Sequence, residues 1–153
     1  MLGTGYIIIR FLLYKLTANI LDMTEQNIER VFAEVCARLP YGVKVLTAVW
    51  NEEKGTESNE ALRVYSVNAD KYVYVNTDDE TIQLYADNVT MLLRPMDDMT
   101  EKEKSEYIGL FEGMPFCPEP QKQIQWLTAH HFDYNGLIEE GLAEKAPKGT
   151  YGN

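Results

Sequence analysis

Adjacent histidines occur near the C-terminal end of the chain, in the stretch WLTAHHFDYN at 126–135. An imidazole can act as a general acid or base or can bind a metal ion, and Asp133 is close enough in sequence to orient one. Neighbouring side chains on a helix point about 100° apart, so His130 and His131 are poorly placed to bind a single ion. Metal-binding histidines on a helix usually lie three or four residues apart. The spacing therefore favours packing and helix termination over catalysis or metal binding.

A cysteine nucleophile is the second chemistry to consider. Cys117 could meet a histidine in space, but nothing in the sequence around it supports a pair of this kind, such as a glycine elbow or a third orienting residue. A structural zinc site needs four ligands, usually in closely spaced pairs, and Cys117 has no nearby cysteine. We predict no catalytic residues, no cofactor and no metal site. An alternative, kept open, is a small enzyme that uses His130, His131 and Asp133.

The residues around the histidines are expected to pack or cap. Asp133 lies where one predicted helix ends and the next segment begins, which is a common place for a capping aspartate. Carboxylates in DDE at 78–80 and MDDMTEKE at 96–103 are expected to form a solvated turn and a helix start. The C-terminal block therefore contains one candidate patch, functional or structural: Trp126, His130, His131, Phe132, Asp133 and Tyr134.

The chain is acidic. Its 153 residues include 24 Asp or Glu and 14 Lys or Arg, which gives a formal net charge of −10. Binding to a nucleic-acid backbone depends on clustered basic residues, and the longest such cluster is Lys102 and Lys104, which alternate with glutamates. We therefore predict no direct nucleic-acid binding. Acidic composition leaves open a second alternative, an inhibitor that mimics nucleic acid and occupies a DNA-binding protein.

A helix is predicted over residues 22–42. Apolar residues recur three and four positions apart and so share one face: Ile28, Val31, Phe32, Val35, Cys36 and Leu39. Asp22 or Thr24 can cap the start of this helix, and Pro40 with Gly42 ends it.

The middle of the chain changes to a period of two. Residues 43–94 predict four or five short strands, interrupted by a polar and mobile loop at 51–60 and by a tight hairpin turn at 68–70. Strands this closely spaced are typical of an antiparallel meander or a small SH3-like barrel.

Further helices are predicted towards the C-terminus, over 100–111, 120–132 and 133–145. The first begins with a capping box, in which Thr100 accepts from the Glu103 backbone and Glu103 reaches back. The predicted fold class is α+β: an N-terminal helix, then a compact antiparallel β-meander or small SH3-like barrel, then two or three C-terminal helices.

The N-terminal lead GYIIIRFLLYKL at 5–16 is apolar but short, and it carries Arg10 and Lys15. It fits neither a membrane span nor a signal peptide. It could be a partner-binding segment, an extra element of the fold, or upstream sequence translated from a start codon assigned too early. We divide the chain into an extension at 1–22, a single α+β domain at 23–147 and a flexible tail at 148–153. Two cysteines without a disulfide framework favour a reducing, cytoplasmic setting.

Three stretches carry a resemblance to a known group of proteins: LPYGVKV at 39–45, LLRPMDDMTEKEK at 92–104 and QWLTAHHFDYNGLIEEGLAEKAP at 125–147. Together they resemble uncharacterised small proteins of gut-bacterial phages, prophages and their hosts, over most of the chain from about residue 24. The apolar lead is the main departure from that pattern. The resemblance implies a small cytosolic accessory protein of a mobile element, and it implies no activity, cofactor or catalytic residue. The predicted function is a non-enzymatic module that binds an unknown host or phage protein.

Overall fold

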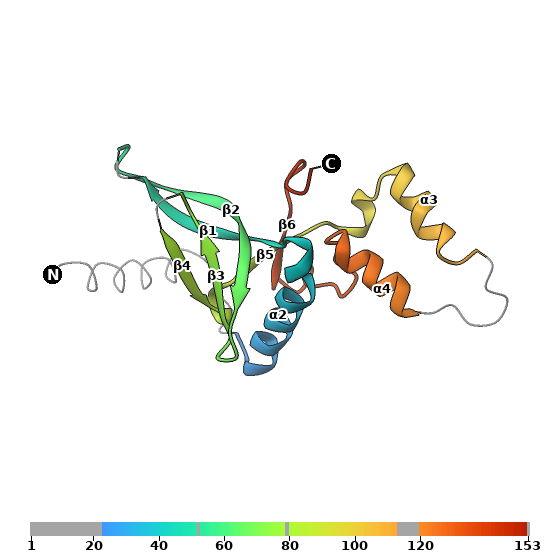
Figure 1. Cartoon of the computed structure of the whole chain (residues 1–153), viewed down its shortest axis with the longest axis horizontal. Coiled ribbons are helices and arrows are strands. Elements are labelled where there is room, and N and C mark those ends of the chain that lie inside the picture. The colour runs from blue at the N-terminus through green and yellow to red at the C-terminus, as the bar shows by residue number, and fades with distance from the viewer. Residues whose placement is uncertain (1–22, 52, 79, 113–119, 153) are drawn as a thin grey trace.

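The structure is a computed structural model that describes residues 23–51, 53–78, 80–112 and 120–152. The N-terminal extension and Cys117 lie outside the described residues. The α+β class is confirmed, with a helix first, a six-stranded mixed sheet and then further helices (Figure 1). The elements are α2 (Glu25–Arg38), η1 (Leu39–Tyr41), β1 (Lys44–Asn51), β2 (Thr56–Val67), β3 (Tyr72–Asn76), β4 (Thr81–Tyr85), η2 (Ala86–Asn88), β5 (Thr90–Leu93), η3 (Met96–Asp98), α3 (Glu101–Gly109), α4 (Pro120–Ala129) and β6 (Ala143–Lys145).

Helix α2 forms where the sequence predicts it. The Thr24 side chain accepts a hydrogen bond from the Asn27 N–H, which satisfies one of the unpaired groups at the start of a helix. Val31 and Val35 are fully buried in a cluster that they share with the strands. Gly42 then adopts a φ of 76°, in the left-handed region that glycine occupies without strain. This residue turns the chain from the helix into β1.

The sheet is open, with strand order β4-β3-β2-β1-β5-β6. Strands β1 to β4 are consecutive antiparallel neighbours, as in a meander, and β5 pairs with the other side of β1. The short β6 adds in parallel to β5. Because β4 and β6 are the two edges and do not pair with each other, the SH3-like barrel is not confirmed.

Strand β2 begins earlier than the sequence predicts. Residues 56–60 of the expected loop pair with 47–51 of β1, so the two strands form a ribbon that extends beyond the rest of the sheet (Figure 1). All of residues 56–61 are exposed. A strand exposed on both faces carries no hydrophobic alternation, and the pattern that reveals the other strands is therefore missing here.

The helix predicted over 133–145 does not form. Gly136 and Gly141 adopt φ values of 74° and 73°, and the Leu142 N–H donates to the Leu137 carbonyl within a turn. Left-handed residues at these two places end any helix between them. The chain instead turns back and enters β6. Leu137 and Leu142 are both buried, as expected for the inner face of the predicted helix.

Two apolar clusters stabilise the fold. The first, here called the sheet core, joins α2 to the strands and contains mostly valine and leucine: Val31, Val35, Val43, Val45, Val64, Val73, Val75, Leu84, Val89, Met91, Leu93, Leu137, Leu142 and Ala143. The second, here called the aromatic core, lies between α3 and α4: Met99, Leu127 and Phe132, packed against by Tyr107, Trp126 and Tyr134. None of the helices in the described ranges combines the length and the apolarity needed to span a bilayer.

The expected flexible tail lies against the sheet where it is described. The Tyr151 hydroxyl accepts from the Lys44 N–H at 3.0 Å and donates to the Leu92 carbonyl at 2.7 Å. Burial raises the pKa of Tyr151 to about 12. The phenol is therefore a neutral hydrogen-bonding group that ties the tail to β1 and β5.

Candidate functional site

His130 is held at the end of α4 by its own helix. Its Nδ1 lies 2.8 Å from the Trp126 carbonyl oxygen. A carbonyl only accepts, so Nδ1 donates the proton. The imidazole also stacks on the Trp126 indole, with the ring centroids 3.9 Å apart and the planes 22° apart. The ring thereby continues the aromatic core.

His131 follows immediately, but its side chain packs on a different part of the molecule. Its Nε2 lies 3.0 Å from the Tyr41 carbonyl, and its ring stacks on Tyr151 with centroids 3.8 Å apart. Its φ of 60° places the backbone in the left-handed region, which ends the helix as the sequence predicts for this pair. The two imidazoles face different neighbours and do not form one site.

The His131 ring is held in its neutral form. Only 4% of the residue is exposed, and its Nδ1 has no hydrogen-bond partner among the described residues. Burial is the largest cause that lowers the pKa of His131 to about 4, electrostatic interactions with Arg38, His130 and Arg94 act in the same direction, and the bond to Tyr41 opposes them. A neutral imidazole that donates from Nε2 carries a lone pair on Nδ1.

Phe132 is fully buried between two arginines. The Arg94 guanidinium carbon lies 4.2 Å from the centre of the Phe132 ring, and Arg38 donates to the Phe132 carbonyl at 3.0 Å. Backbone bonds fix the same stretch to the end of β5: the Arg94 N–H donates to the His131 carbonyl, and the Asp133 N–H donates to the Arg94 carbonyl, both at 2.8 Å. These contacts attach the end of α4 to the sheet.

Asp133 and Tyr134 complete the patch through local bonds. Asp133 accepts from the Leu137 and Ile138 N–H groups at 2.9 and 2.8 Å, so it stabilises a turn in place of the helix that it was expected to cap. The Tyr134 hydroxyl lies 3.0 Å from the Thr128 hydroxyl oxygen. These bonds do not bring Asp133 or Tyr134 together with the two histidines in one site.

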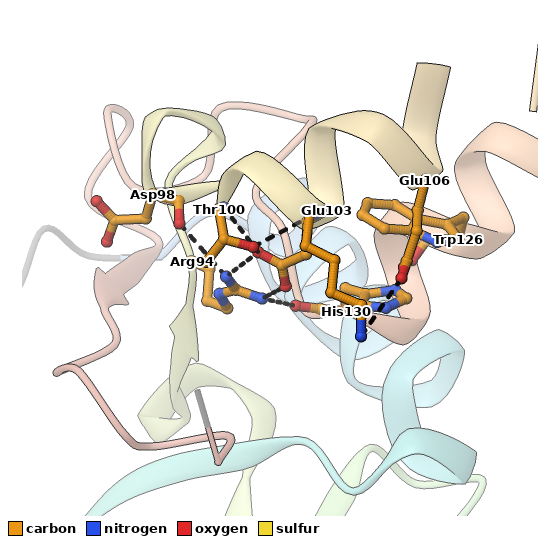
Figure 2. Close-up of polar contacts among 8 residues, drawn as sticks. Arg94, Asp98, Thr100, Glu103, Glu106, Trp126 and His130 are labelled. Atoms are coloured by element: carbon orange, nitrogen blue, oxygen red, sulfur yellow. Dashed lines mark hydrogen bonds and ion pairs between the residues drawn. The ribbon is translucent and has the colours of Figure 1, made fainter. Parts of the chain in front are cut away.

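Arg94 and Glu103 form a two-pronged ion pair beneath the start of α3 (Figure 2). The two nitrogen–oxygen distances are 2.7 and 2.9 Å. Glu103 also accepts from the backbone N–H and the hydroxyl of Thr100 at 2.8 and 2.9 Å, while its own N–H donates to Thr100 Oγ1. The predicted capping box is therefore confirmed. The bonds from Arg94, followed by those from Thr100, hold the pKa of Glu103 at about 2.

Arg38 is the second arginine of this region and is fully buried. It pairs with Glu34 one helical turn earlier, and its guanidinium carbon lies 5.3 Å from the centre of the Tyr134 ring. The sequence offered a signal that was not used. Arg38 follows Val31 and Val35 at helical spacing on the buried stripe, where a charged residue needs a partner inside the fold. Tyr151 gives no such signal, because its hydrogen bonds to Lys44 and Leu92 join residues that are distant in sequence.

The arrangement does not assemble a reactive centre from the predicted patch. No group of three or more His, Cys, Asp or Glu side chains in the described parts of the chain is placed to hold a metal ion. The two arginines and their carboxylates neutralise one another and stabilise the fold.

The chain has no significant match among protein-family models, curated proteins or solved structures.

Proposed function

We propose that the protein is a phage- or prophage-encoded accessory protein of the cytoplasm that acts by binding another protein, from the host or the phage. One observation supports this proposal most directly. We call α3, the two residues that follow it and α4 the helical arm. Several apolar side chains of this arm are exposed to solvent. Their exposed fractions are 59% for Ile108, 40% for Phe111 and 47% for Ile124.

The helical arm stands to one side of the sheet (Figure 1). Its two helices are joined by the Tyr107 and Trp126 rings, whose centroids lie 5.5 Å apart, and Tyr107 also contacts Phe111 at 5.4 Å. Ile108 lies near the end of α3, and Phe111 follows in the turn, where its N–H donates to the Ile108 carbonyl at 3.0 Å. Single exposed apolar residues are ordinary, whereas several on one projecting element are typical of an interaction surface.

An enzyme built on the predicted patch is not favoured. His131 is buried, His130 is bonded to Trp126 within its own helix, and both carboxylate oxygens of Asp133 cap the following turn. A catalytic group must reach the reacting atoms. These three side chains would have to leave their present partners to do so.

The test uses the full chain as bait in a lysate of the bacterial host that carries the gene. A captured protein is identified, purified and titrated against the wild type and two variants by calorimetry. Ile124→Lys should weaken binding at least 10-fold, since it introduces a charge into the apolar surface. Trp50→Lys is the matched control, because Trp50 is 46% exposed on the distant β1–β2 ribbon, and it should bind as the wild type does. Equal affinities for all three proteins would exclude the helical arm, and turnover of a small molecule without any partner would overturn the proposed function.

A further inference from the structure

We propose that residues 147–152, here called the strap, open from the sheet when His131 takes up a proton. This device is separate from the proposed interaction role, because the contacts of the strap with Lys44 and Leu92 do not involve the exposed apolar side chains of the helical arm. It rests on how the strap is attached, on what lies beneath it and on which charges surround His131.

Tyr151 is the attachment point of the strap. The β1–β5 ladder pairs Val45 with Met91, and one step further along this register Lys44 faces Leu92. At that step the Tyr151 hydroxyl bridges the Lys44 N–H and the Leu92 carbonyl. A side chain thus replaces the next backbone contact of the ladder. The Lys44 ammonium group adds a bond to the Thr150 carbonyl at 2.7 Å.

Two open surface hollows border the strap. One, of about 480 Å³, extends towards Arg94 and Thr100. The other, of about 520 Å³, extends towards Tyr41 and Arg63. Gly149, Thr150 and Tyr151 line both hollows, so the strap is the wall that they share. Lifting the strap would join them into one open groove.

His131 lies directly under the strap, and among the residues that the structure describes it has no acceptor for a second proton. Its Nε2–H already donates to Tyr41, and its Nδ1 is buried without a partner. Protonation would place an N–H donor and a positive charge where nothing accepts either. The Tyr151 ring covers one face of the imidazole, and strap residues 147–149 and 152 are exposed. Moving the strap is therefore the shortest route by which water can reach the imidazole.

The charged neighbours of His131 favour opening. Arg38 approaches from α2, Arg94 from the end of β5, and His130 from the end of α4. Each arginine has its own carboxylate, Glu34 or Glu103, so neither of these two carboxylates is left to receive an imidazolium. An imidazolium would gain from lying on the Tyr151 ring. Burial and the two arginines outweigh that gain, since they hold the pKa of His131 at about 4.

The size of the effect follows from linkage. With the strap closed, the pKa of His131 is about 4, and an open strap returns it towards the ordinary 6.5. The open form then binds the proton first as the pH falls. Between pH 7.5 and pH 5 the equilibrium constant for opening should rise about 30-fold.

Hydrogen exchange by NMR on the full chain measures this opening. The reporter is the Lys44 amide, which donates to Tyr151, and the control is the Val64 amide, which donates to Val43 at 2.9 Å within the central strands. After correction for intrinsic exchange, the protection of Lys44 should fall about 30-fold from pH 7.5 to pH 5. A smaller fall at Val64 would support a local opening. Parallel changes at both amides, or no change at Lys44, would overturn the proposal.

Variants separate the trigger from its surroundings. His131→Asn keeps a residue that tolerates the left-handed backbone but cannot titrate, so its Lys44 protection should lose the pH dependence. His130→Gln is the matched control: His131, its burial and the two arginines remain, so its Lys44 amide should still lose protection as the pH falls.

The reverse measurement gives a second, independent test. Binding linkage is reciprocal, so removing the cover with Tyr151→Ala should move the pKa of His131, followed through its ring resonances, from about 4 towards 6.5. This holds even if His131→Asn does not fold. An unchanged His131 pKa in Tyr151→Ala would show that the strap does not control the imidazole.

Discussion

The sheet core and the aromatic core consist of different kinds of side chain, although Arg94, directly after β5, connects them by lying over the Phe132 ring. The sheet core is a layer of valines and leucines between α2 and the strands. The aromatic core has only three buried apolar members, and it depends on the two arginines that flank Phe132 and on their carboxylates. Apolar burial tolerates many alternative side chains, whereas a buried ion pair fails when either partner is lost.

Arg94→Ala should therefore cause the largest loss of stability. It leaves Glu103, only 9% exposed, without its partner, and losses of about 3–5 kcal/mol are typical when one member of a buried pair is removed. Urea unfolding followed by circular dichroism measures the change. The double variant Arg94→Ala with Glu103→Ala should lose less than the sum of the two single variants, because it removes both charges. Strict additivity would show that the pair contributes nothing beyond its separate residues.

Val35→Ala probes the sheet core by the same measurement. Removing two buried methyl groups from a fully buried position should reduce the free energy of unfolding by about 2–3 kcal/mol. The loss should be equal at pH 7 and pH 4, since no charge is involved. A matched change on the exposed side of the same helix, Ala33→Ser, should cost less than about 0.5 kcal/mol. A pH-dependent loss of stability for Val35→Ala would contradict the view that the sheet core depends on apolar burial alone.

Acid should act on the aromatic core through Glu103. Its pKa of about 2 lies below the ordinary 4.5, so the unfolded chain binds the proton first as the pH falls. The stabilising contribution is complete above pH 4.5 and is lost as the pH falls towards 2. Between pH 5 and pH 3 the wild type should lose about 2 kcal/mol more than Glu103→Gln does. Equal losses in the two proteins would mean that the folded carboxyl titrates normally.

Local patterns in the sequence are sufficient to predict the helices and strands that bury one face. Helix α2, its Thr24 cap and the capping box of α3 each depend on residues within a few positions of one another. Strands β1 and β3 alternate buried and less buried residues, β5 is a short continuous apolar run, and strands are predicted in all of these places. The start of β2 is not predicted, because residues 56–61 are exposed on both faces.

Contacts distant in sequence account for the features that were missed. Strand β6 is three residues long and exists only because β5 offers a parallel partner. The Arg38 bond to the Phe132 carbonyl spans 94 residues, and the Tyr151 bond to Lys44 spans 107. The histidine pair was correctly expected to end a helix. The His130 ring stacks on Trp126 and the His131 ring on Tyr151. This difference depends on the left-handed backbone at His131, which the spacing of residues in the sequence does not predict.

The carboxylate of Glu103 serves two elements at once, and this has a mechanical consequence. The same oxygens begin α3 by binding Thr100 and neutralise Arg94 at the end of β5. Helix α3 therefore cannot pivot at its first turn without breaking the ion pair. We therefore expect a displacement of the helical arm to be transmitted through this ion pair to β5, which pairs with β1 on one side and β6 on the other.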